Sequence, residues 1–137
     1  MKRNYVYYHR RALDVEKMRE AMKYLLGTHN FTSFCGNVDD IDKVRTIYQA
    51  DLIDEDGELT FIFVGNGFLR YMIRIMVGTL IQVGEGRKKP EDIEFIIQSQ
   101  NRNLAGHTAK PQGLYLQRVD YPQELLRPIE NCVEKNH

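Results

Sequence analysis

The sequence predicts an α+β fold in which an antiparallel or mixed sheet carries helices packed on one face. Three observations support this prediction: a globular composition, two strand-like segments joined by a tight turn, and helical segments with apolar faces on either side of them. The chain has 137 residues, of which 42% are hydrophobic and 28% are charged. Such a composition is typical of globular domains. A chain of this length is expected to form one compact domain.

The first predicted element is a helix over Leu13–Leu26. Asp14 is a suitable N-cap, because its side chain can accept a backbone N–H of the first turn, and Gly27 suits the end of the helix. Apolar side chains recur at helical spacing on one face: Leu13, Met18, Met22, Leu25 and Leu26. The following segment, Thr28–Lys43, contains scattered Asn, Asp, Gly and Ser residues and is predicted to be a loop.

A hairpin of two strands is predicted next, over Val44–Ile53 and Leu59–Val64. The first segment is rich in β-branched residues, and the second alternates apolar and other side chains. Between them lies the sequence Asp-Glu-Asp-Gly, residues 54–57, which is typical of a turn. Gly57 is expected to adopt a positive φ there.

A long helix over Phe68–Val83 follows, with Asn66 as its predicted N-cap and Gly84 as its end. Its apolar face is broad, which predicts burial on most sides. A short helix is predicted to begin near Pro90, since the fixed φ of proline suits the first helical position. After a polar loop, Gly113–Tyr121 is predicted to be one more strand.

Charge and motif content argue against several classes of function. Lys plus Arg and Asp plus Glu both total 19, so net charge is zero and strong bulk attraction to nucleic acid is not expected. No apolar run reaches the roughly 18 residues of a membrane span, and no secretory leader is recognisable, so a cytoplasmic protein is expected. Cys35 and Cys132 lack the spacing of metal ligands, and no nucleotide-binding motif occurs. We therefore predict neither a metal nor a cofactor.

Arg74 is the residue most suggestive of chemistry, because it lies within a helical segment that is otherwise largely apolar. It shares a helix face with Arg70, four residues earlier. An isolated buried guanidinium is very costly, so Arg74 must pair with a carboxylate or phosphate or extend its head group into solvent. A structural ion pair and a functional anion contact both remain open at this point.

Two polar segments allow similar pairs of interpretations. Gly65-Asn66-Gly67 could present backbone N–H groups to an anion at a helix start, or could be a strand-to-helix turn that requires small residues. The loop of residues 106–113 leads into the last predicted strand. Such loops often carry function, but nothing in this one alone identifies a chemistry.

Four ordered blocks of the sequence resemble those of one family. Residues 65–80, GNGFLRYMIRIMVGTL, closely resemble the GNxFLRxMVRNIVGTL block of the bacterial tRNA pseudouridine synthase A family. Residues 27–34 are similar to its GxHDFxxF block, residues 45–47 to its RTI strand, and residues 105–122 to its AGPTAxxxGLYLxxVxYP block. The resemblance predicts a domain over residues 1–122, followed by a polar tail over residues 123–137.

The resemblance implies a pseudouridine synthase-like catalytic-domain half. Its members isomerise uridine to pseudouridine at positions 38 to 40 of the tRNA anticodon arm, without a cofactor. Arg74 stands where the family has the arginine that pairs with the catalytic aspartate. Leu114 stands where the family packs an apolar side chain beneath the reacting base. Arg70 and Asn66, which belong to the same block as Arg74, are expected to contact the substrate.

One block of the family has no counterpart here. The catalytic aspartate lies in a GRTDAGVHA sequence that is absent, and the active-site tyrosine also belongs upstream of the matching region. The chain therefore resembles the C-terminal half of the enzyme and is predicted to be inactive alone. The expected partners are tRNA, an N-terminal half carrying the aspartate, and a second copy in a homodimer. The alternative is a stand-alone, non-catalytic RNA-binding or dimerisation module in which Arg74 meets phosphate.

Overall fold

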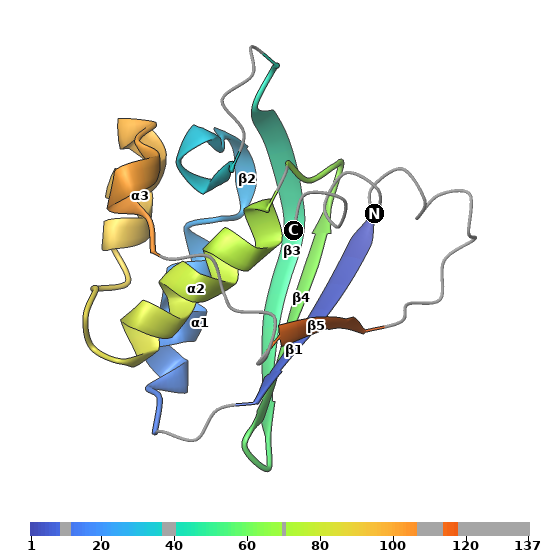
Figure 1. Cartoon of the computed structure of the whole chain (residues 1–137), viewed down its shortest axis with the longest axis vertical. Helices are drawn as coiled ribbons and strands as arrows, with labels where there is room; N and C mark the ends of the chain where they lie inside the picture. Colours follow the sequence, from blue (N-terminus) through green and yellow to red (C-terminus); the bar gives the residue numbers. More distant parts are fainter. Residues whose placement is uncertain (9–11, 37–40, 70, 107–113, 118–137) are drawn as a thin grey trace.

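The computed structural model describes residues 1–8, 12–36, 41–69, 71–106 and 114–117. Five strands form one sheet in the order β2-β3-β4-β1-β5, and every neighbouring pair is antiparallel. The strands are β1 (Lys2–Tyr8), β2 (Gly27–Asn30), β3 (Val44–Glu55), β4 (Glu58–Gly65) and β5 (Leu114–Gln117). The predicted α+β class is confirmed, and the sheet is antiparallel rather than mixed (Figure 1).

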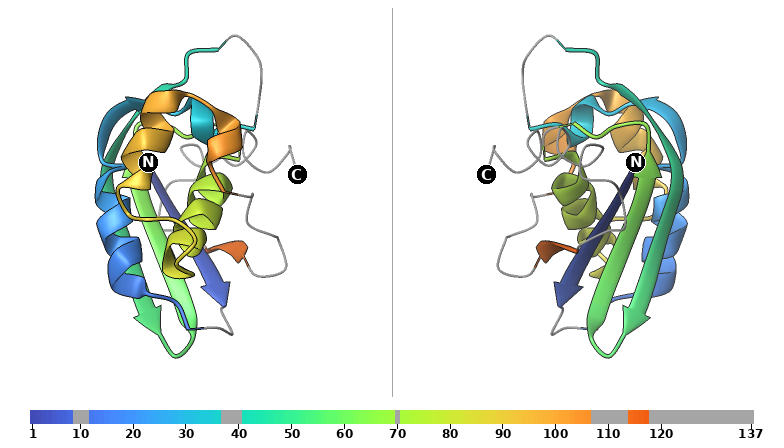
Figure 2. Two further views of the ribbon diagram at one scale, coloured as in Figure 1. Left: turned by 90° about the vertical axis from the view of Figure 1, so that its left-hand side faces the viewer. Right: turned by 90° about the vertical axis from the view of Figure 1, so that its right-hand side faces the viewer.

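The helices lie together on one side of this sheet, as Figure 2 shows from two directions. They are α1 (Val15–Lys23), α2 (Met72–Gly84) and α3 (Asp92–Ser99), with short 3-10 turns at η1 (Thr32–Phe34) and η2 (Arg102–Leu104). Helix α1 is shorter than the predicted Leu13–Leu26, but its N-cap is Asp14, as predicted. In the described part of the chain, no helix is long and apolar enough to cross a membrane.

The β3–β4 hairpin confirms the most local of the predictions. The strands pair in register from Gln49 and Val64 to the turn, where Glu55 faces Glu58. Asp56 and Gly57 occupy the turn with φ values of 51° and 78°. Two consecutive residues at positive φ match the right-handed twist of the flanking strands, which is why an Asp-Gly pair favours this hairpin.

Two strands were not anticipated from the sequence. Residues 27–30 lie within the segment predicted to end a helix and begin a loop, but they form β2 by pairing with β3, from Gly27 opposite Ile47 to Asn30 opposite Val44. Strand β1 pairs with both β4 and β5 and so lies inside the sheet. Pairing partners far away in the sequence stabilise these strands, and the local sequence of either segment shows no clear alternation.

The start of α2 also corrects the prediction. The helix begins at Met72 rather than Phe68, and its N-cap is Tyr71 rather than Asn66. The side-chain oxygen of Asn66 instead accepts the backbone N–H of Thr46 on β3, at 2.8 Å. This amide links the end of β4 to β3 and therefore does not cap the helix. Gly84 is the last helical residue, close to the predicted end.

The core lies between α2 and the helix-facing side of the sheet. Along β4 the buried side chains alternate with partly exposed ones, and Leu59, Phe61 and Phe63 face the core. Nearly all of α2 is buried, which confirms the broad burial predicted for this segment. Strand β5 falls within the predicted Gly113–Tyr121 strand, whose other residues lie outside the described part.

Candidate functional site

Arg74 lies in the first turn of α2 and only 7% of it is exposed. Its side chain therefore stays within the protein, and the solvent-extended alternative does not apply. The guanidinium carbon lies 5.7 Å from the centroid of the Tyr71 ring, a distance suited to a cation–π contact. The N-terminal end of a helix carries a partial positive charge, so a cation in this turn is disfavoured by the helix dipole. Burial and the helix dipole therefore both make this a costly position for a cation.

Tyr71 holds an unusual backbone conformation directly before this helix. Its φ is 59° and its ψ is 4°, which places a bulky residue in the left-handed region. Its carbonyl accepts the N–H of Ile75 at 2.9 Å and so begins the helical hydrogen bonds. Its ring lies against Gly36, where an added Cβ would come within 2.3 Å of the Tyr71 Cδ2 atom. The tyrosine side chain thus uses space that only glycine leaves free.

The Gly65-Asn66-Gly67 segment lies at the end of β4 in the chain and is hydrogen-bonded to β3. Besides accepting the N–H of Thr46, Asn66 donates its own backbone N–H to the Thr46 carbonyl at 3.0 Å. A Cβ added to Gly65 would lie 2.7 Å from that same carbonyl oxygen. Of the two interpretations of this segment, the structure supports the close turn, because the backbone N–H of Asn66 already has a protein acceptor.

The polar loop that begins at Gly106 is anchored at its start by α2. The Gly106 N–H donates to the Thr79 hydroxyl at 2.8 Å, and that hydroxyl donates to the Ile75 carbonyl, also at 2.8 Å. The Arg102 guanidinium donates to the Gly106 carbonyl at 3.0 Å. Burial lowers the pKa of Arg102, although a guanidinium stays protonated in proteins. Residues 107–113 themselves lie outside the described part of the chain.

Three of the four site residues expected from the sequence have a described backbone position, and they lie in different parts of the fold. Asn66 and Arg74 lie near the two ends of the connection from β4 to α2. Leu114 begins β5, where its backbone pairs with Tyr7 of β1, two strands away from β4. Arg70 and the side chain of Leu114 lie outside the described part. Tyr71 and Gly36 were not identified from the sequence, because their relation to Arg74 depends on residues that meet only in the fold.

Metal-binding groups do not gather in the part of the chain that the structure describes. No three His, Cys, Asp or Glu residues lie together there in a way that could hold an ion. Cys35 is a buried cysteine of the core.

A sequence profile of the tRNA pseudouridine synthase family matches residues 21–122. This chain belongs to that family. It is 53% identical over 121 residues to tRNA pseudouridine synthase A 1 of Bacillus cereus, an alignment that covers 88% of this chain. It is 51% identical over 120 residues, 87% of this chain, to tRNA pseudouridine synthase A of Anoxybacillus flavithermus. The family resemblance inferred from the sequence blocks is thereby confirmed.

The alignments also establish how much of a synthase this chain represents. Each of those two alignments covers 49% of the relative, as does the 48% identical match to tRNA pseudouridine synthase A of Oceanobacillus iheyensis. The chain thus spans about half the length of the curated synthases it matches.

Proposed function

We propose that this chain is the C-terminal half of a cytoplasmic tRNA pseudouridine synthase that acts on uridines 38 to 40 of the anticodon arm. Residues 1–122 would form the domain and residues 123–137 its tail. The observation that carries the proposal is Arg74, a buried cation in the first turn of α2 within a member of this family. In the complete enzyme, the partner that we assign to this guanidinium is the catalytic aspartate of the other half.

The reaction is an isomerisation and needs no outside reagent. The bond between the ribose and a base nitrogen breaks, the base turns, and a new bond forms between the ribose and a base carbon. The proton lost from that carbon is balanced by one gained at the freed nitrogen. A carboxylate is needed to attack or to stabilise positive charge. Arg74 orients that carboxylate and keeps it ionised, because an adjacent positive charge lowers the pKa of an aspartate.

The remaining site residues take roles around this pair. Leu114 packs beneath the reacting base, and Arg70 and Asn66 contact the RNA. Asn66 can do so through its amide nitrogen while its oxygen accepts the Thr46 N–H. The complete enzyme is a homodimer that binds tRNA across both subunits. The sequence block that carries the family's catalytic aspartate is absent from this chain, so the isolated chain is expected to be inactive.

The test joins this chain to the part of the Bacillus cereus synthase that it does not match. The joined enzyme should form pseudouridine in tRNA, and the chain alone should not. Replacing Arg74 by Lys or Ala should lower kcat by about 100- to 1,000-fold, the range seen when one preorganised polar group is removed from an active site. Arg87→Lys is the matched control, because the Arg87 side chain is largely exposed, and it should leave kcat unchanged.

Two results would contradict the proposal. The first is pseudouridine formation by the isolated chain, which would show that it supplies its own carboxylate. The second is an unchanged kcat in the Arg74 variants of the joined enzyme. If the joined protein is inactive but the chain binds tRNA in an Arg74-dependent and salt-sensitive manner, the stand-alone RNA-binding module is the correct function.

A further inference from the structure

Tyr71 differs from the other residues that adopt a positive φ. Among the described residues other than glycine, Asp56, Tyr71 and Gln100 have φ values of 51°, 59° and 50°. Asp56 lies in the hairpin turn and Gln100 caps the C-terminus of α3, both of which commonly use this region. Tyr71 instead precedes a helix, where an extended conformation is usual. A bulky aromatic residue rarely adopts this region, so the conformation of Tyr71 is strained.

Contacts on both sides of the residue hold Tyr71 in this conformation. Before it, the Leu69 carbonyl accepts the N–H of Met72 at 3.0 Å, and after it the N–H of Ile75 reaches the Tyr71 carbonyl. The ring meets the backbone at Gly36, at a site too close for any side chain. The strain is thus maintained by tertiary packing, and its consequence is a fixed direction for the tyrosine ring.

That direction places the ring beside Arg74. The two residues are three positions apart, the spacing at which side chains on a helix surface become neighbours. The ring provides a face for the guanidinium at 5.7 Å, which offsets the unfavourable helix dipole at this end of α2. An arginine side chain has many rotamers, and a rigid aromatic neighbour reduces the number available.

We infer that Tyr71, held by Gly36, is a positioning residue that fixes the Arg74 guanidinium in the direction needed by the catalytic carboxylate. The inference rests on the proposed function, because it assigns the strained Tyr71 a role at that same site. Tyr71 acts through Arg74 and contacts neither the substrate nor the reacting atoms. It follows that loss of the ring affects the rate of the chemical step, whereas tRNA binding is preserved.

Substitutions that separate the ring from the backbone conformation test this role in the joined enzyme. Tyr71→Asn removes the ring but keeps a residue that tolerates the left-handed region. It should lower kcat about 10-fold, since small misplacements of a catalytic group are costly, and leave KM within about twofold. Tyr71→Phe keeps the ring and should retain the original kcat. Tyr48→Asn, at a tyrosine that is 64% exposed on β3, is the control and should have no effect.

A double variant distinguishes positioning from a merely structural role. In an enzyme that already carries Arg74→Lys, adding Tyr71→Asn should lower kcat no further, because both changes act on one group. Multiplied losses would overturn the inference. Should Tyr71→Asn fail to fold in thermal denaturation, Tyr71→Leu takes its place, since it fills the same space without an aromatic face.

The inference and the proposed function fail in different ways. Unchanged kcat in Arg74→Lys would refute the proposed function. A large loss in Arg74→Lys together with unchanged kcat in Tyr71→Asn would refute the positioning role of Tyr71 alone. A rise in KM without a fall in kcat would also refute it, because it would assign the ring to tRNA binding.

Discussion

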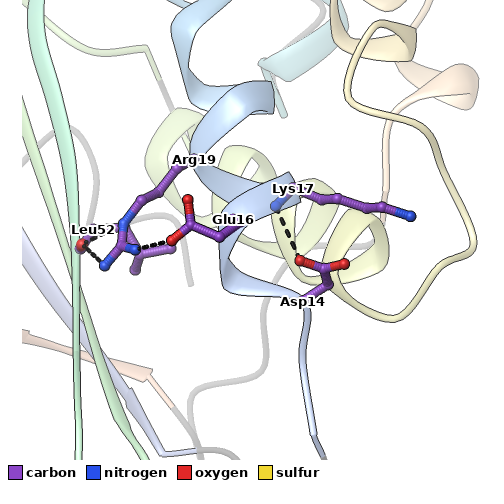
Figure 3. A network of polar contacts seen from close by, with 5 residues as sticks. All are labelled: Asp14, Glu16, Lys17, Arg19 and Leu52. Atoms are coloured by element: carbon purple, nitrogen blue, oxygen red, sulfur yellow. Dashed lines mark hydrogen bonds and ion pairs between the residues drawn. The ribbon is translucent and has the colours of Figure 1, made fainter.

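Helices α1 and α2 begin in opposite ways. Asp14 precedes α1 in an extended conformation, and its carboxylate accepts the N–H of Lys17 at 3.2 Å (Figure 3). Tyr71 precedes α2 at positive φ, has no side-chain capping bond and is held by its contact with Gly36. The capping bond of the first start lies within four consecutive residues, whereas the second start needs two segments that meet only after folding. The side-chain cap of α1 is therefore specified locally, and the start of α2 depends on tertiary packing.

The arginines near these two helix starts differ in their exposure and in their surroundings. Arg19 of α1 donates to the Leu52 carbonyl at 3.0 Å and to the Glu16 carboxylate at 2.7 Å (Figure 3). Its side chain is 42% exposed, so this ion pair contributes little to stability. Arg74 is buried at the helix end where a cation is disfavoured. Arg19 thus occupies an ordinary surface position, whereas Arg74 occupies a position that burial and the helix dipole both disfavour.

The largest expected effect comes from breaking the tertiary contact at the start of α2. Gly36→Ala places a Cβ 2.3 Å from the Tyr71 ring and should destabilise the chain by about 1–3 kcal/mol, as overpacking usually does. Chemical denaturation of the chain measures this change in the free energy of unfolding. Adding Tyr71→Asn should remove most of the cost, because the atom that the new Cβ meets is then absent.

Gly86→Ala is the control for this comparison. Gly86 has a φ of 83° but nothing lies within 4 Å of an added Cβ, so only backbone strain opposes the substitution. We expect a cost of roughly 1 kcal/mol from the conformational preference alone, unaffected by Tyr71→Asn. Equal costs for the two glycines, both insensitive to residue 71, would show that Gly36 has no specific role at the start of α2.

The fold could be predicted from the sequence where short-range chemistry determines it. The Asp56–Gly57 turn and the Asp14 cap follow from the preferences of individual residues for particular φ values and hydrogen bonds. Strands β1 and β2 were missed because their hydrogen-bond partners lie far away in the sequence. A segment that pairs with β3 or β4 can form a strand without strong β-propensity of its own.

The residues of the candidate site also differ in whether the sequence alone could identify them. Arg74 could be singled out because a charge among apolar residues is costly and therefore conspicuous in the sequence. Tyr71, which lies beside Arg74, and Gly36, which lies against Tyr71, could not be singled out, because a tyrosine and a glycine 35 positions apart are ordinary until the fold brings them together. The N-cap was assigned to Asn66 from residue type alone, and its bond to Thr46 shows that a good capping residue can be engaged by a strand instead.

A smaller effect is expected from the locally specified start of α1. Asp14→Ala removes the acceptor of the Lys17 N–H and should destabilise the chain by about 1 kcal/mol, the usual cost of losing an N-cap. Asp14→Asn keeps a capping side chain and should cost far less. The loss should appear equally in a chain that also carries Gly36→Ala, because Asp14 contacts the C-terminal end of α2 at Gly84, whereas Gly36 contacts Tyr71 before its first turn. Strong coupling between them would contradict the view that α1 is specified locally.

The smallest effect distinguishes the predicted role of Asn66 from the one observed. Asn66→Ala removes the acceptor of the Thr46 N–H at an exposed site, so we expect a cost of about 0.5 kcal/mol. Amide hydrogen exchange shows where that cost falls: the Thr46 amide should exchange faster, and the amides in the first turn of α2 should be unchanged. Asn66→Asp, which retains an acceptor, is the control. Faster exchange at the start of α2 would mean that Asn66 supports the helix after all, and that Tyr71 is not its only determinant.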